Sequence, residues 1–548
     1  MKNIFLVGAF FFANLALLAQ QKKEEKPFTR PKLVVGIVVD QMRYDYLTRF
    51  WDQYGEGGFK RMVNEGFNCK NNHFNYIPTK TAAGHASVYT GATPKVHGII
   101  GNDWYDKTED RMVYCTEDGV VESLGTDSDA GKMSPRRMVA STMTDQLKLA
   151  TVSRGKVIGI SLKDRGSILP AGHAADGAYW FHGKKEGHWV TSTYYMEKLP
   201  KWVKKFNDSD AAEKYKKVWN PLYDIETYTA SIEDDNEFEG TFSGEKKPTF
   251  PHDLPKLWKD NGRFDLLKGV PFGNSLTTDF AEAAIEGEDL GKDDITDFLA
   301  VSFSATDYVG HRFGVSAKET QDTYLRLDQD LERFFAFLDN KVGKGEYTVF
   351  LTADHAAVEV PSYLESMEIP GGYFSKKDFI DSLTEFLDDT FGSDKLIKNF
   401  SNEQIFLDQK EIKKLGISSA EVENAIVTEI KNYKHITEAY SGTDLRNQEF
   451  TDGLANRLQK GYHFKRSGDV LVVLDPGFIN STNRKGTTHG SGHAYDTHTP
   501  LLFFGKGINH GATVRRTEIP DIANTVCALL GITFPSGKSG EPIWEVIE

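Results

Sequence analysis

The sequence predicts an α/β fold, with a mostly parallel central sheet sandwiched by helices and with inserted cap segments. Short runs of β-branched and aromatic residues recur along the 548-residue chain, and stretches with helical periodicity separate them. Runs that are apolar throughout are typical of strands buried on both faces, as in parallel sheets. Several of these runs lead into an aspartate, and in open α/β sheets the chemistry lies beyond the carboxyl ends of the strands.

Six runs are expected to form strands of this sheet. In chain order they cover residues 32–39, 156–162, 296–304, 347–352, 469–474 and 499–505. The first run, KLVVGIVV, leads into Asp40, the third is followed by Asp307 and the fourth by Asp354. Because the carboxyl ends of parallel strands meet at one edge, we expect these carboxylates to lie close together.

Two segments between the strands are expected to be insertions into a single catalytic domain that spans 21–548. Residues 166–290 are rich in Trp, Tyr, Lys and Gly, show little strand periodicity, and are too long for a plain connection. Residues 360–465 contain SKKDFIDSLTEFLDDTF and SSAEVENAIVTEIKN, whose apolar spacing predicts amphipathic helices.

The N-terminal residues 1–20 have the composition of a signal peptide. Lys2 precedes the apolar run IFLVGAFFFANLALLA, which is short for a membrane span. A retained anchor is the alternative, although no cysteine follows the run to carry a lipid. We therefore expect a periplasmic or secreted protein without stable membrane insertion.

Charge and cysteine content argue against a nucleic-acid-binding protein and against a disulfide scaffold. The formal net charge of −14 argues against nucleic-acid binding, although it allows a local basic pocket for a small anion. Three cysteines are too few for a disulfide scaffold, and none has a metal-binding spacing. Cys69 and Cys115 could pair in an exported protein, whereas Cys527 lies in an apolar helical pattern and is expected to be a buried thiol.

Aspartates and histidines with the spacing of metal ligands follow the predicted strand ends. Asp307 and His311 are four residues apart and would share one face of a helical turn. Asp354 and His355 follow one strand, and Asp40 follows another. The segment GTTHGSGHAYDTHTP adds His489, His493 and His498. Each motif alone is commonly structural, but together they indicate mixed carboxylate and imidazole ligation, which suits a pair of zinc ions.

The segment YIPTKTAAGHASVYTG predicts a loop that ends at a helix N-terminus. Pro78 disfavours helix before it, and Gly91 would end the helix. We expect Thr81 at the N-cap, with its hydroxyl at the positive end of the helix dipole. Such a threonine would be a plain cap without metal ligands nearby; beside a zinc ion it becomes the candidate nucleophile. Thr79 is the alternative nucleophile by residue type.

These motifs resemble the alkaline phosphatase superfamily, in its type I phosphodiesterase/nucleotide pyrophosphatase branch. The stretches PTKTAAGHASVYTGATPKVHGIIGNDW, SFSATDYVGH, TADH and GTTHGSG match the nucleophile and metal-binding segments of that branch, in the same order, over residues 40–490. The resemblance implies an alkaline phosphatase-like fold with two Zn²⁺ ions and a threonine nucleophile.

The resemblance also implies how the ligands are divided between the two zinc ions. One ion would be held by Asp307, His311 and His489, and the other by Asp40, Asp354, His355 and Thr81. His489 is preferred among the late histidines because it occupies the Thr-His-Gly position, which leaves His493 and His498 with supporting or structural roles. The second ion would activate Thr81, and the first would stabilise the leaving oxygen.

One departure from the diesterases bears on the substrate. Residues 82–85 read Ala-Ala-Gly-His where the diesterases usually have Phe-Pro-Asn-His, and Lys163 and Arg165 follow a predicted strand. This resembles a bacterial monoesterase subgroup, the phosphate-irrepressible alkaline phosphatases of the PafA type, in which this lysine and arginine and an asparagine matching Asn102 contact the phosphate. These donors, with the amide of Ala82, would hold the oxygens of a monoester dianion.

We therefore predict an alkaline phosphatase that hydrolyses small-molecule phosphate monoesters through a covalent phosphothreonine at Thr81. A phosphodiesterase or nucleotide pyrophosphatase on the same core is the alternative, and an inactive exported binding protein is the least expected. The chain lacks the Cys/Ser-x-Pro-x-Arg signature of a sulfatase, and position 81 is not the serine that a phosphoglycerate mutase would use.

Overall fold

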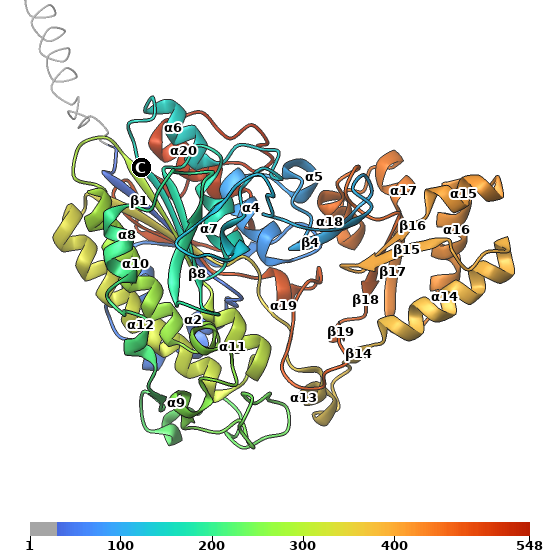
Figure 1. The fold of residues 1–548 in the computed structure, drawn as a ribbon, viewed down its shortest axis with the longest axis horizontal. Coiled ribbons are helices and arrows are strands. Elements are labelled where there is room, and N and C mark those ends of the chain that lie inside the picture. The colour runs from blue at the N-terminus through green and yellow to red at the C-terminus, as the bar shows by residue number, and fades with distance from the viewer. Residues whose placement is uncertain (1–29, 548) are drawn as a thin grey trace, which may run out of the picture. The chain divides into compact units, whose positions relative to one another are not determined.

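A large mixed sheet lies at the centre of the structure, a computed structural model that describes residues 30–547 (Figure 1). Within those residues its ten strands are β1 (Leu33–Val39), β2 (Phe67–Cys69), β6 (Ser123–Leu124), β7 (Val157–Ser161), β8 (Gly177–His182), β9 (His188–Ser192), β12 (Asp297–Phe303), β13 (Tyr347–Thr352), β20 (Leu501–Gly505) and β21 (Gly511–Thr513). The strand order is β21-β2-β20-β13-β1-β12-β7-β8-β9-β6. The signal peptide expected at 1–20 lies outside the described residues.

The five middle strands of this sheet are parallel. β13, β1, β12, β7 and β8 pair with one another in parallel. Antiparallel pairing adds β20 beyond β13 on one side and β9 beyond β8 on the other. The expected fold class, α/β with a mostly parallel central sheet, is confirmed.

Side chains of β1 alternate between two apolar cores, one on each face of the sheet. Val34 and Val38 pack with the helices α4 (Thr81–Thr90), α6 (Met143–Ala150) and α20 (Asp521–Leu530). Val35 and Ile37 pack with α10 (Phe272–Glu288), α11 (Ala305–Phe313) and α12 (Lys318–Leu338) on the opposite face. Every residue of β1 is buried, as its continuous apolar run predicts.

One of the expected strands lies in a different sheet. The run DVLVVL forms β18 (Val470–Leu474), which belongs to a separate four-stranded antiparallel sheet with β15 (Ile397–Ser401), β16 (Gln404–Leu407) and β17 (Ile436–Ser441). The prediction that it joins the central sheet was therefore wrong. An apolar run indicates that a strand is buried, but it does not indicate which strands pair with it. β18 is buried beneath helices in the small core of the second sheet.

The two helices predicted between 360 and 465 are confirmed and cover this second sheet. They are α14 (Lys376–Phe391) and α16 (Ser419–Ile430), drawn in orange in Figure 1. Side chains from both helices, among them Leu383 and Ile426, pack with Val470 and Val472 of β18. This part of the fold therefore has its own apolar core.

The segment 166–290 contributes two strands to the central sheet that the sequence did not indicate. β8 and β9 extend the central sheet, and their aromatic residues Trp180 and Trp189 are buried. A mixture of Trp, Tyr, His and Gly lacks the β-branched pattern from which the other strands were predicted, although aromatics do favour strands.

The remaining helices and strands are short or peripheral. The helices are α2 (Tyr46–Arg49), α3 (Phe59–Glu65), α5 (Pro94–His97), α7 (Asp164–Ala171), α8 (Lys201–Asn207), α9 (Leu254–Leu257), α13 (Pro361–Ser366), α15 (Gln409–Leu415), α17 (Gly442–Asn447), α18 (Gly453–Gly461) and α19 (Ala494–Thr497). The strands are β3 (Asn72–His73), β4 (Asp103–Asp106), β5 (Arg111–Tyr114), β10 (Val218–Trp219), β11 (His252–Asp253), β14 (Gly372–Phe374), β19 (Phe478–Asn480) and β22 (Thr517–Glu518).

Helix α4 begins at Thr81 and ends, as predicted, before Gly91, which has φ 61°. The expected N-cap role of Thr81 is wrong. Lys80 occupies the N-cap with extended backbone, and Thr81 is the first residue inside the helix. The threonine hydroxyl is therefore not used for capping and faces the site described below.

None of the three cysteines, which all lie in the described part of the chain, forms a disulfide. Cys69, Cys115 and Cys527 are all buried and free, so the pairing considered for the first two is not present. Within residues 30–547, no helix combines the length and apolar character that crossing a membrane requires.

Candidate active site

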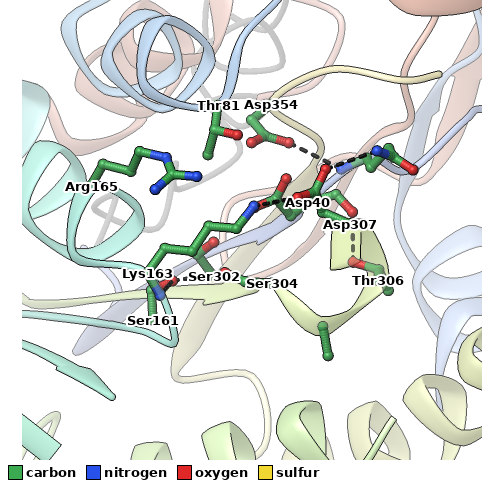
Figure 2. Close-up of polar contacts among 12 residues, drawn as sticks. Asp40, Thr81, Ser161, Lys163, Arg165, Ser302, Ser304, Thr306, Asp307 and Asp354 are labelled. Carbon is green, nitrogen blue, oxygen red and sulfur yellow. Dashed lines mark hydrogen bonds and ion pairs between the residues drawn. The ribbon is translucent and has the colours of Figure 1, made fainter. Parts of the chain in front are cut away.

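Three buried aspartates from three neighbouring strands meet beyond the carboxyl edge of the sheet. Asp40 follows β1, Asp354 follows β13, and Asp307 lies in the first turn of α11, which follows β12. The Lys163 ammonium donates to Asp40 Oδ2 and to Asp307 Oδ2, at 2.6 Å each (Figure 2). The structure thus brings Asp40 together with two carboxylates that lie more than 250 residues further along the chain, as their positions at strand ends predict.

The first expected metal site is assembled around Asp307. His311 lies one helical turn further along α11, and its Nε2 is 3.2 Å from Asp307 Oδ1. His489 Nε2 is 3.8 Å from the same oxygen. Ligand atoms of these three residues all lie within 4.8 Å of one another, as a common ion requires.

The second expected site contains Asp40, Asp354 and His355. His355 Nε2 is 3.5 Å from Asp40 Oδ1 and 3.5 Å from Asp354 Oδ2. On this side, among the described residues, the group whose ligand atoms all lie within 4.8 Å of one another is Asp40, Asp307 and His355, with Asp307 in place of Asp354. Lys163 lies between two members of this group, with its ammonium 2.6 Å from Asp40 Oδ2 and 2.6 Å from Asp307 Oδ2.

The three histidines are oriented in the same way. Nδ1 of His311 lies 2.8 Å from the Thr487 carbonyl oxygen, and Nδ1 of His489 lies 2.7 Å from that of Thr79. Nδ1 of His355 is 3.0 Å from a backbone carbonyl as well. Since a carbonyl can only accept, each Nδ1 carries a proton, and in the neutral ring the lone pair is on Nε2, the atom that faces the carboxylates. Metal-binding histidines are characteristically oriented by such hydrogen bonds.

Two carboxylate oxygens fit a metal centre because they lack protein donors. Asp40 Oδ1 and Asp354 Oδ2 are buried and accept no hydrogen bond from the residues that the structure describes. An unpaired buried carboxylate oxygen is costly unless a cation lies beside it. These orphaned oxygens and the Nε2 lone pairs form a donor set that fits divalent metal ions.

The pKa values of the histidines follow from burial and the nearby carboxylates. Burial lowers the pKa of His355 to about 4, and burial and the neighbouring His355 hold that of His489 well below the usual value. Burial also lowers the pKa of His311, but the charge of Asp307 outweighs it and raises that pKa. His355 and His489 are therefore neutral near pH 7, which is the form that binds metal.

The carboxylates repel one another in this buried setting. Burial, together with the negative charges of Asp307 and Asp354, raises the pKa of Asp40 well above its usual value. Burial also acts to raise the pKa of Asp307, but the charges of His311 and Lys163 outweigh it and hold that pKa well below the usual value. A cation bound among them would relieve the repulsion.

The Thr81 hydroxyl reaches this cluster from the start of α4. Its Oγ1 is 3.4 Å from His355 Nε2, the nitrogen that also faces Asp40 and Asp354. Thr81 is buried, and a Cβ on Gly84 would overlap the backbone of Asp354, so α4 can approach the cluster only with glycine there. Thr79, the other candidate, instead donates its hydroxyl to the Ser491 carbonyl.

His85 fixes this end of α4 to the cluster. Its Nδ1 lies 2.9 Å from the Thr81 carbonyl oxygen and 3.3 Å from Asp354 Oδ2. Its Nε2 is 2.8 Å from the hydroxyl of Ser302 on β12. Since Nδ1 donates to the carbonyl, Nε2 accepts from the serine, and the chain from Ser302 through His85 holds Thr81 against the sheet.

The residues expected to contact phosphate lie around Thr81. Arg165, at the start of α7, extends toward Thr81 in Figure 2, and its buried Nε has no partner among the described residues. Asn102 Oδ1 accepts the backbone N–H of Ala82 at 2.9 Å. The Ala82 amide is therefore engaged by Asn102 and is not free for an oxygen of the substrate, contrary to expectation.

Gln41 is a site residue that sequence reasoning missed. Its backbone N–H donates to Asp354 Oδ1 and its side-chain amide donates to Asp307 Oδ1, at 3.2 and 2.8 Å. Its φ of 66° lies in the left-handed region, which is unusual for a residue other than glycine. No local pattern in the sequence indicates this conformation.

The other two late histidines lie outside both groups of ligands. His493 Nε2 is 3.2 Å from the Leu474 carbonyl oxygen. His498 Nε2 is 3.0 Å from the Lys70 carbonyl oxygen, and its ring stacks on Tyr44. Both are engaged in structural contacts, as the sequence analysis allowed.

Known proteins resemble this chain over almost its whole length. A family model described as type I phosphodiesterase / nucleotide pyrophosphatase matches residues 34–496. A protein of Myroides odoratus named "Calcium-transporting ATPase" is 46% identical over 551 residues, 100% of this chain and 99% of its own. Alkaline phosphatase PafA of Elizabethkingia meningoseptica is 46% identical over 534 residues, 97% of each chain.

A solved structure of wild-type alkaline phosphatase PafA superposes with a TM-score of 0.92 at 46% identity, and covers 95% of this chain and 100% of that one. The alkaline phosphatase-like fold and the resemblance to the PafA type are thereby confirmed. This chain belongs to the type I phosphodiesterase/nucleotide pyrophosphatase family.

Proposed function

We propose that this protein is an alkaline phosphatase that hydrolyses small-molecule phosphate monoesters. The observation that carries the proposal is a set of unused donors around Thr81. Lys163 uses two of its three N–H groups on carboxylates, and the buried Nε of Arg165 has no partner among the described residues. A monoester dianion needs such charged donors for its non-bridging oxygens.

Two Zn²⁺ ions are the cofactors that fit these ligands. Asp307, His311 and His489 would hold one ion, and Asp40, Asp354 and His355, together with Thr81, would hold the other. When bound, such ions supply Lewis-acid stabilisation of the attacking and the leaving oxygen atoms. Carboxylate and imidazole ligands with oriented Nδ1 protons support zinc in particular.

The residues of the chain perform the remaining chemistry. The Thr81 hydroxyl gives its proton to water, and its oxygen attacks phosphorus in line with the ester oxygen. The P–O bond of the ester breaks as the phosphothreonine forms, and the departing oxygen takes a proton from water and leaves as the alcohol. Water then hydrolyses the phosphothreonine and releases phosphate. The free N–H of Lys163, the guanidinium of Arg165 and the Asn102 side-chain amide bind the non-bridging oxygens, where charge and placement lower the barrier.

Asn102 contributes by the orientation of its amide group. Its Oδ1 is occupied by the backbone N–H of Ala82, which leaves Nδ2 to donate. Because Ala82 is adjacent to Thr81, this hydrogen bond places the donor beside the nucleophile. A phosphodiesterase on the same core is less well supported, since a diester carries one charge fewer and would gain less from Lys163 and Arg165.

A substrate comparison tests the proposal. The metal-replete protein should hydrolyse an aryl phosphate monoester with a kcat/KM at least about 100-fold above that for a matched aryl methyl diester, and Thr81→Ala should reduce the monoester value by at least about 1000-fold. ATP should be included, in view of the name of the Myroides relative. A preference for diesters, or a Thr81→Ala variant that retains its metal and its rate, would refute the proposal.

We also propose an exported protein with one catalytic domain. Compact packing of the chain from Pro31 onward supports a single domain into which 166–290 and 360–465 are inserted. The apolar run within residues 1–20 supports a cleaved signal peptide and a periplasmic or secreted location. Mass spectrometry of the protein recovered from an expressing bacterium should give a mature N-terminus near residue 21; an intact N-terminus would contradict cleavage.

A further inference from the structure

Tyr114 lies between Arg165 and an acidic side chain. It ends β5, in the β4–β5 hairpin that follows the nucleophile segment. Its hydroxyl accepts a hydrogen bond from Arg165 Nη1 at 3.0 Å and donates one to Asp164 Oδ1 at 2.6 Å. The phenol therefore joins the guanidinium to a carboxylate without direct contact between the two charges.

Arg165 has an unusual environment for a guanidinium beside buried carboxylates. Among residues 30–547 the Tyr114 hydroxyl is its single side-chain hydrogen-bond partner, and no carboxylate forms an ion pair with it. A carboxylate in direct contact would hold the guanidinium firmly but would compete with phosphate for its N–H groups. A neutral hydroxyl holds the same group and leaves its positive charge available.

The Tyr114 ring is itself held in place. It packs against an apolar cluster that includes Ala82 of α4 and Leu169 of α7. These helices carry Thr81 and Arg165, so the cluster that supports the ring is built in part from both of the elements whose separation sets the distance from Thr81 to the guanidinium. Asp164 accepts a hydrogen bond from the phenol, which orients the oxygen lone pairs toward Arg165.

We propose that Tyr114, oriented by Asp164, is a positioning residue that aims the Arg165 guanidinium at the phosphoryl group while leaving its charge uncompensated. This inference rests on the proposed function. Tyr114 then contributes to the preference for dianionic monoesters, because a guanidinium that is already oriented loses less conformational entropy when the substrate binds.

A double-mutant cycle tests the inference. Tyr114→Phe keeps the ring and its packing but removes the hydroxyl. It should lower kcat/KM for an aryl monoester by about 10-fold, the usual size for a hydrogen bond to a charged group, and weaken inhibition by inorganic phosphate similarly. In the Arg165→Ala background the same change should cost less than about 2-fold, because its target is gone.

Matched variants separate positioning from general structure. Asp164→Asn should likewise lower kcat/KM in the parent protein and have little further effect in the Arg165→Ala background. Tyr105→Phe, on the neighbouring strand β4, removes a hydroxyl that bonds Asp110 and should leave activity unchanged. Equal losses from Tyr114→Phe in both backgrounds, or no loss in either, would overturn the inference.

The outcomes also distinguish this inference from the proposed function. If Arg165→Ala lowers monoester hydrolysis strongly while Tyr114→Phe has no effect, the positioning role is refuted and the phosphatase proposal stands. If Arg165→Ala itself has no effect on monoesters, the phosphate role of Arg165 and the positioning role of Tyr114 are both refuted, whereas the proposed function is refuted only if the parent protein prefers diesters.

Discussion

Lys163 determines the charge balance of the site. Its ammonium is buried and donates to Asp40 and Asp307 at 2.6 Å each. Two Zn²⁺ ions would bring four positive charges, which three aspartates and the Thr81 alkoxide would offset. The incoming dianion would then depend on Lys163 and Arg165 for compensation.

Replacing Lys163 should therefore discriminate between substrates. Lys163→Gln removes the charge at similar length and should lower kcat/KM for a monoester by about 100-fold, but that for a diester by less than about 10-fold. Steady-state assays on both aryl substrates, with bound metal measured in each preparation, check this. Equal losses on the two substrate classes would contradict the monoesterase assignment.

At the same scale, the sequence predicted the candidate metal ligands better than the residues that hydrogen-bond to them. Asp40, Asp307 and Asp354 were found because buried strands end just before them, and His311 because helical spacing pairs it with Asp307. Gln41 was missed because no local sequence pattern indicates its left-handed backbone or its two long-range hydrogen bonds. Its role follows only from tertiary contacts.

At the scale of elements, helix α4 determines the position of Thr81, the proposed nucleophile. Gly84 is one turn after Thr81 and sits directly against the backbone of Asp354. Tyr89, further along the helix, donates its hydroxyl to the carbonyl of Gly36 on β1. Two glycines therefore allow the helix to lie close to the sheet, Gly84 in α4 and Gly36 in β1.

Gly84→Ala should move the helix away from the cluster. A methyl group would overlap backbone atoms, which cannot rotate aside, and such overpacking costs about 1–3 kcal/mol of stability. We expect a fall in melting temperature and a loss of at least about 10-fold in monoester kcat, since the Thr81 hydroxyl is displaced from His355.

Gly119→Ala provides the control, because a Cβ at that position meets nothing within 4 Å. It should change neither melting temperature nor kcat, as measured by calorimetry and steady-state assay. Gly84→Ala behaving like Gly119→Ala would show that the close approach of α4 to Asp354 does not matter.

The elements themselves were predictable to different degrees. The five strands of the central sheet that were expected have continuous apolar runs, and their positions were confirmed. β18 has the same pattern but packs in the second sheet, since burial alone carries no information about pairing partners. β8 and β9 were missed because β8 has no β-branched residue and β9 has only two, so neither shows the continuous β-branched run of the other strands.

At the scale of the described chain, the segment 166–290 is joined to the core through buried acidic groups. Glu239 is fully buried, and Gly240 after it donates to the carbonyl of Arg312, at the end of the helix that carries His311. Glu319, at the start of α12, is also fully buried. One oxygen of each glutamate has no hydrogen bond from the described residues.

Glu239 should make stability depend on pH. Burial and the nearby Glu319 raise its pKa from 4.5 to about 10, so the folded protein retains a proton that the unfolded chain releases above about pH 4.5. The unfolded state then binds fewer protons across this window, and stability falls as pH rises from about 5 to about 10.

Glu239→Gln, which is neutral at every pH, should reduce this dependence. We expect the decrease in melting temperature between pH 7 and pH 9.5 to be smaller than in the parent protein by about 2 °C. Glu237→Gln, an exposed neighbour in the same segment, should behave like the parent. An unchanged pH dependence in Glu239→Gln would show that Glu239 does not retain its proton on folding.

The central claim is that side chains from distant parts of the chain hold two metal ions against the Thr81 hydroxyl. Crystals of the zinc-loaded protein, measured at the zinc absorption edge, test it most directly. Two anomalous peaks about 4 Å apart are predicted, one among Asp307, His311 and His489, the other among Asp40, Asp354 and His355 with Thr81 Oγ1 in bonding distance. A single peak, or a threonine hydroxyl out of reach of both ions, would contradict the account.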